Sequence, residues 1–176
     1  MYYALWIILG IIVILIFLVI IAPVSYDVRR SIIIHRKLPE VFDYIKSIKN
    51  QDNWSPWKKK DPNMKQEFEG VDGEVGFISR WEGNKDVGTG EQEIKKIVTN
   101  ERIESELRFF KPWKSQSDAY IHVEAIDNKS TRVIWGFSGK QKRPLNIFFL
   151  FFSMEKSVGK DFEEGLNDLK KILENQ

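Results

Sequence analysis

The sequence has no cysteine among its 176 residues. Disulfide bonds, thiolate metal sites and cysteine nucleophiles are therefore excluded. It has two histidines, His35 and His122, and no cluster of histidines and carboxylates at a spacing typical of metal ligands. The net charge of +2 at pH 7 is too small to indicate a nucleic-acid partner. We therefore expect no metal, no cofactor and no nucleic acid.

Residues suited to catalysis are also scarce. His35 ends the first predicted strand, and His122 lies on the outer face of a later one because its neighbours alternate with it. Gly83, Gly88 and Gly90 are scattered around strands and do not open a helix, so they indicate hairpins rather than a phosphate loop. The sequence predicts no catalytic residue.

Charge is absent from the first 26 residues, and the first charged side chain is Asp27. Residues 4–22 are apolar throughout. At about 1.5 Å per residue this run spans about 28 Å, close to the ~30 Å hydrocarbon core of a bilayer. We predict one transmembrane anchor over residues 1–24, with bilayer contact through residues 4–22, followed by one domain over residues 25–176.

The alternative for this apolar run is a cleaved secretory signal. No basic residue precedes the run, and residues 22–24, Ala-Pro-Val, make a poor cleavage site, so an uncleaved anchor is favoured. Lys and Arg follow the run but do not precede it, which by the positive-inside rule predicts a single-pass protein with a cytoplasmic domain. The basic residues are Arg29, Arg30, Arg36 and Lys37.

Beyond the anchor, the pattern predicts strands followed by a helix. Ser25–His35 is typical of a strand, and Pro39 opens a short helix. About six short alternating strands follow between residues 64 and 138. Apolar residues then recur at three and four residues from Phe151 to Leu173, which indicates one long amphipathic helix. The prediction is an α+β fold, a curled antiparallel sheet of about seven strands around a long C-terminal helix.

Alternation along these strands puts aromatic rings and a few polar groups on the concave face of the sheet, while Glu91 and Glu93 face solvent. We expect this face and the long helix to enclose a ligand cavity; a core filled completely by the rings is the alternative. The expected cavity residues are Phe77, Ser79, Trp81, Gln92, Leu107, Phe109, Ile121, Trp135, Phe137, Phe151, Met154, Val158 and Phe162.

The segment Ile147–Phe152 is apolar on all sides and follows basic residues at 140, 142 and 143. Six residues are too short to span a bilayer. The segment therefore either closes the cavity mouth or dips into the membrane beside the basic loop.

Three stretches carry a resemblance to a known family: Ser31–Tyr44, Trp54–Trp57 and Gly159–Leu166. Together with the element order they resemble the SRPBCC superfamily, also called START or helix-grip. The last stretch is similar to the polyketide cyclase/dehydrase-like branch, whose members often carry one N-terminal membrane helix. The resemblance implies an apolar cavity between sheet and helix. The expected function is membrane-tethered binding of a small apolar or lipid-like ligand. The alternatives are a cyclase/dehydrase-type enzyme and a filled-core interaction or regulatory domain.

Overall fold

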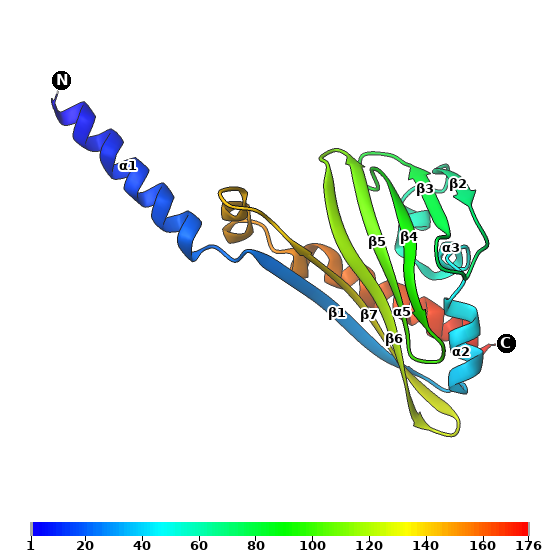
Figure 1. Ribbon diagram of the computed structural model, residues 1–176. Helices are drawn as coiled ribbons and strands as arrows, with labels where there is room; N and C mark the ends of the chain where they lie inside the picture. The colour runs from blue at the N-terminus through cyan, green and yellow to red at the C-terminus, as the bar shows by residue number, and fades with distance from the viewer. Residues whose placement is uncertain (1, 176) are drawn as a thin grey trace.

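The computed structural model describes residues 2–175 and shows one N-terminal helix projecting from an α+β domain (Figure 1). The helices are α1 (Tyr2–Ile21), α2 (Leu38–Ile45), α3 (Gln51–Trp54), α4 (Pro56–Lys60), the 3₁₀ helix η1 (Leu145–Leu150) and α5 (Met154–Glu174). The strands are β1 (Ser25–Ile34), β2 (Lys65–Glu69), β3 (Ile78–Glu82), β4 (Thr89–Val98), β5 (Arg102–Lys111), β6 (Ser115–Asp127) and β7 (Ser130–Lys140).

The seven strands form one antiparallel sheet in the order β1-β7-β6-β5-β4-β3-β2. The chain therefore meanders from β2 to β7, and β1 adds to the far edge beside β7. Helix α5 runs across one face of this sheet, and α2, α3 and α4 lie toward the end of that layer (Figure 1). The predicted helix-grip architecture is confirmed.

The core lies between α5 and the concave face of the sheet because alternate strand residues point there. In β6 and β7 the buried side chains recur every second residue, including Val123, Val133 and Trp135. Along α5 the buried stripe recurs at helical spacing, including Phe162 and Leu169. Both periodicities are those expected from the sequence.

Helix α5 begins three residues later than the spacing of apolar residues suggested. Ser153 has extended backbone angles, and its side chain accepts a hydrogen bond from the backbone N–H of Lys156, so it forms the N-cap. Phe151 consequently lies outside the helix and is 80% exposed. The expectation that Phe151 forms part of the cavity floor is wrong.

Helix α5 comes close to its neighbours at Gly165. A Cβ atom there would lie 2.8 Å from the indole ring of Trp135 and 3.2 Å from Cδ of Pro56. Any larger residue would push α5 away from the sheet and from α4. Gly165 therefore serves close packing and does not make room for a ligand.

Helix α1 carries no buried side chain. It is the one helix among residues 2–175 that is long and apolar enough to cross a membrane, a property it shares with signal sequences. A core helix of a soluble protein would be mostly buried, which α1 is not.

The C-terminal end of α1 contacts η1. The side-chain amide of Asn146, which is fully buried, donates to the carbonyl oxygens of Val19 at 2.9 Å and Ala22 at 3.0 Å. A nitrogen of Arg143 lies 3.4 Å from the carbonyl oxygen of Ile20. These side chains satisfy carbonyl groups that a helix end otherwise leaves unpaired. The end of α1 is thereby docked onto the domain.

Candidate ligand-binding cavity

A cavity of about 510 Å³ lies between the concave face of the sheet, α5 and the α3–α4 segment. This volume is within the roughly 300–1,000 Å³ of typical small-molecule sites. The surface around it is mostly apolar, and polar side chains from several elements interrupt it. The residues expected from sequence that line it are Ser79, Trp81, Gln92, Leu107, Phe109, Trp135, Phe137, Met154, Val158 and Phe162.

Phe77 and Ile121 were expected in this cavity but lie outside its lining. Phe77 is 1% exposed and stacks on Phe68 with the ring centroids 6.0 Å apart. Ile121 lies toward α2, where the interior is packed. Alternation gave the correct face for Ile121 but not its position along the sheet.

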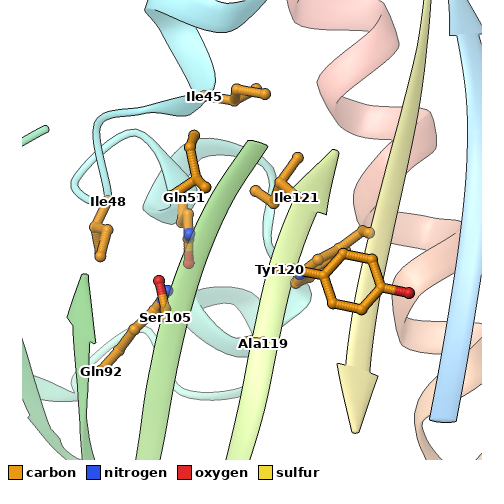
Figure 2. Close-up of a pocket in the computed structure, with 10 residues that line it drawn as sticks. Ile45, Ile48, Gln51, Gln92, Ser105, Ala119, Tyr120 and Ile121 are labelled. Carbon is orange, nitrogen blue, oxygen red and sulfur yellow. The ribbon is translucent and has the colours of Figure 1, made fainter. Parts of the chain in front are cut away.

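The packed region around Ile121 contains a second space of only about 10 Å³ (Figure 2). In this close-up the side chains of Gln51, Gln92 and Ser105 point toward one another, while Tyr120 points away from them. A space of this size holds about one water molecule. It borders the large cavity, since Gln51 and Gln92 line both, and it marks where the interior closes.

Aromatic rings form the floor of the large cavity. Trp135 stacks on Phe162 of α5, with ring centroids 4.1 Å apart and an angle of 12° between the planes. Trp54 meets the same indole edge-on at 4.8 Å. Such pairs add about 0.5–1.5 kcal/mol beyond the area they bury. Trp135 is therefore held between Trp54 of α3 and Phe162 of α5.

Tyr26 is a lining residue that the sequence analysis missed. Its hydroxyl lies 2.8 Å from the hydroxyl oxygen of Ser117, another lining residue. Burial raises the pKa of Tyr26, although the hydrogen bond to Ser117 opposes this rise. The signal was present, because Tyr26 is two residues before the buried Val28 and shares its face of the strand.

The α3–α4 segment and β2 give the cavity a polar wall, also missed from sequence. The ammonium group of Lys58 donates to Oε1 of Gln66 at 3.2 Å, and the amide of Gln66 donates to Asp52 at 2.9 Å. Within residues 2–175, two further lining residues carry a buried polar atom without a partner: Ser55 at Oγ and Trp81 at Nε1. Both atoms are enclosed by neighbouring protein atoms, so the polar groups that face the cavity on this wall are those of Lys58, Gln66 and Asp52.

The mouth of the cavity is formed by the β3–β4 turn, the β5–β6 turn and the residue before Ser153. Lys85–Gly88, Lys111–Trp113 and Phe152 line it there. These turns lie at the end of the sheet where β1 starts and β7 ends, because the antiparallel pairings bring the start of β4, the end of β5 and the start of β6 to that same end. The mouth therefore opens at the end of the domain from which α1 projects (Figure 1).

The histidines and glutamates considered in the sequence analysis lie outside the cavity. Glu91 and Glu93 are on the outer face, where Arg108 binds them at 2.6 and 2.8 Å. Hydrogen bonds from Lys95 and Arg108 lower the pKa of Glu93. His122 pairs with Glu124 at 3.2 Å. In the described part of the chain, no group of three or more histidine and carboxylate side chains is placed to hold a metal ion.

No protein-family model matches the sequence, and no curated protein matches it. Solved structures do match. An aromatase/cyclase from a Streptomyces species has a TM-score of 0.61 at 10% identity, over 86% of this chain and 94% of that one. The protein Ara h 8.0201 has a TM-score of 0.56 at 11% identity, over 86% and 99%. The Aha1 dimer from Colwellia psychrerythraea has a TM-score of 0.58 at 14% identity, over 85% and 96%. These matches show that the three proteins share the fold of this chain.

Proposed function

The chain has the helix-grip fold of the SRPBCC superfamily, and we propose that it binds a small apolar or lipid-like molecule while α1 tethers it to a membrane. The single observation that carries the proposal is the cavity of about 510 Å³ beneath the curled sheet. A site of this kind binds chiefly by burial of apolar surface, worth about 25 cal/mol per Å².

The polar wall supports an amphipathic rather than a purely apolar ligand. Lys58, Gln66 and Asp52 form a hydrogen-bonded row beside the apolar lining. A polar group of the ligand would pair with these side chains at the cavity wall. The rings of Trp135 and Phe162 suit the apolar part of the same ligand.

The docking of α1 supports its retention as a membrane anchor. If α1 were removed as a signal sequence, the buried amide of Asn146 would lose its acceptor on Val19. Ala22, which is 3% exposed, would also become a free chain end. Residues 1–24 thus form the proposed anchor and residues 25–176 the proposed ligand-binding domain. The basic residues that follow α1 favour a cytoplasmic domain.

A second candidate function, an enzyme of the cyclase/dehydrase type, is favoured by one observation. Asp52 and Lys58 both line the cavity wall, joined through Gln66. A carboxylate and an ammonium group beside an apolar cavity are the materials of acid–base chemistry. Conversion of a captured molecule by the native chain, lost in Asp52→Asn with binding retained, would favour this candidate.

The binding proposal is tested by purifying the full chain from membranes and identifying co-purifying small molecules by mass spectrometry. We expect an amphipathic molecule in stoichiometric amount. The matched variant is Val158→Trp, which puts an indole into the cavity from α5. It should fold and lose the molecule. Equal retention by the variant would contradict the proposed site, and an empty native chain that binds no added fatty acid would contradict the function.

A further inference from the structure

We propose that η1, the residues that follow it and the tip of the β5–β6 hairpin form a membrane-docking surface. This surface seats the cavity mouth on the bilayer that α1 spans, and its partner is a lipid surface containing anionic headgroups. The inference rests on the membrane tether proposed above and adds to it the route by which a ligand reaches the cavity.

The first observation is a set of large apolar side chains that the domain leaves uncovered at one end. Phe148, Phe151 and Phe152 of the η1 segment are 62%, 80% and 53% exposed. Trp113, at the tip of the β5–β6 hairpin, is 63% exposed. Exposed aromatic residues gathered at one end of a domain are typical of a contact with a partner or a membrane. A segment serving only as the cover of the cavity would turn these rings inward, whereas only Phe152 and Trp113 line the mouth.

The second observation fixes where this surface lies relative to the bilayer. Asn146, the second residue of η1, donates hydrogen bonds to the carbonyl groups of Val19 and Ala22 at the end of α1. Because η1 is attached to the last turn of the membrane helix, its phenylalanines lie at the depth where that helix leaves the bilayer. The tip of the β5–β6 hairpin lies at the same end of the domain (Figure 1). Phenylalanine and tryptophan side chains are typical of the apolar face of segments that lie in the membrane interface.

The third observation is the charge around the exposed rings. Lys140, Lys142 and Arg143 precede η1, and Lys111 and Lys114 flank the exposed Trp113; the described structure leaves all five exposed. Asp86 on the β3–β4 turn is the acidic residue that lines the mouth. Basic side chains beside apolar ones bind a surface that has an apolar interior and anionic headgroups. This complementarity identifies the partner as a lipid bilayer.

The consequence for function follows from the position of Phe152 and Trp113. Both rings are exposed and both border the cavity mouth. With these rings in the interface, a lipid-like molecule passes between bilayer and cavity without its apolar part crossing water. Loading of the cavity then depends on docking as well as on the tether.

The test exploits the absence of cysteine from the chain. Single cysteines are placed in the full-length protein at Phe148 and Phe151, labelled with the environment-sensitive fluorophore nitrobenzoxadiazole, and reconstituted into vesicles. The vesicles contain phosphatidylcholine with a minor fraction of phosphatidylglycerol, with and without a lipid that carries a quenching doxyl group. The matched control is Val71→Cys in the β2–β3 turn. Val71 is 62% exposed, like Phe148, but it lies at the end of β3 away from the β3–β4 turn and the cavity mouth. Val13→Cys, within α1, reports on the tether itself.

We expect blue-shifted emission and doxyl quenching at positions 148 and 151, weaker quenching there without phosphatidylglycerol, and water-like, unquenched emission at Val71. Water-like emission at 148 and 151 with quenching at Val13 would overturn the docking surface and leave the tether intact. Absence of quenching at Val13 would overturn the tether and the docking inference with it. Equal quenching with and without phosphatidylglycerol would overturn the role assigned to the basic residues.

Discussion

Replacement of Val158 by tryptophan tests the cavity directly. Val158 is on α5, one turn from Met154 and one turn from Phe162, and all three line the cavity. An indole at this position extends into a space of about 510 Å³ rather than into packed side chains. We therefore expect the variant to fold without the penalty of about 1–3 kcal/mol that overpacking a filled core brings.

The expected loss of affinity follows from the surface that the new ring removes from the ligand. A buried tryptophan covers about 150–250 Å², so replacing valine takes roughly 100 Å² of apolar contact from a ligand in the same space. At about 25 cal/mol per Å², this loss is about 2.5 kcal/mol. Because 1.4 kcal/mol corresponds to a factor of ten, binding should weaken about sixtyfold.

The assay is a titration of the full-length chain with a dansyl-labelled fatty acid, followed by native mass spectrometry of the bound fraction. Val71→Trp is the matched control, because it adds the same ring at an exposed turn outside the cavity lining. Thermal unfolding of both variants verifies that they are folded. A folded Val158→Trp chain that binds as tightly as the native one would refute the assignment of this helix stripe to the ligand.

Three further predictions concern stability and topology. Trp135→Ala should lower the free energy of unfolding by about 3–5 kcal/mol in denaturant titrations, because the ring packs against Trp54 and Phe162. A much smaller loss would mean that these two ring contacts contribute little to the stability of the domain. Burial raises the pKa of Tyr26, so its contribution to stability is complete below the unfolded pKa of about 10 and is lost as pH rises through the folded value. Tyr26→Phe should therefore flatten the alkaline decline in stability. A cysteine at Asn175 should stay protected from an impermeant thiol reagent in intact cells, and labelling without permeabilisation would reverse the proposed orientation.

The sheet was predictable in detail because strand side chains alternate with a period of two. Alternation assigned Trp81, Gln92 and Phe109 to the concave face, and all three line the cavity. Periodicity was less reliable at the start of α5. The apolar spacing includes Phe151, but the N-cap at Ser153 separates that residue from the helix. The extended backbone of the N-cap residue decides where the helix begins, even when the apolar spacing continues for one more turn before it.

The contacts of the polar wall and of the end of α1 were not predictable, because they join side chains from different helices and strands. Lys58 meets Gln66 across the α4–β2 connection, and Asn146 meets Val19 more than a hundred residues earlier. A local sign of the second contact existed, since Asn146 is a polar residue between the apolar Leu145 and Ile147. Its partner could not be inferred from spacing.

The position of the cavity follows from which residues share a row across the sheet. One row pairs Ser79 with Gln92, Gln92 with Leu107, and Leu107 with Ser117, so small and polar side chains leave space above α5. Four residues further along β6 than Ser117, toward α2, Ile121 lies opposite Ile103 of β5 and Trp135 of β7. There the interior is closed.

The row that contains Ser79 and Ser117 lies toward the end of the sheet where β1 begins, and β1 follows α1 in the chain. If larger side chains filled this row, the interior would be solid at that end. The exposed rings of η1 would then border no cavity, and no ligand could exchange between it and a bilayer. With Ser79 and Ser117 in this row, the same end of the domain carries α1, the exposed phenylalanines that follow η1 and the entrance to the cavity. Ser117→Leu, which fills this row, should therefore abolish ligand binding and leave the quenching at positions 148 and 151 unchanged. That result would show that the cavity and the docking surface act separately. Loss of both binding and quenching would instead show that the bound ligand itself holds the domain against the bilayer.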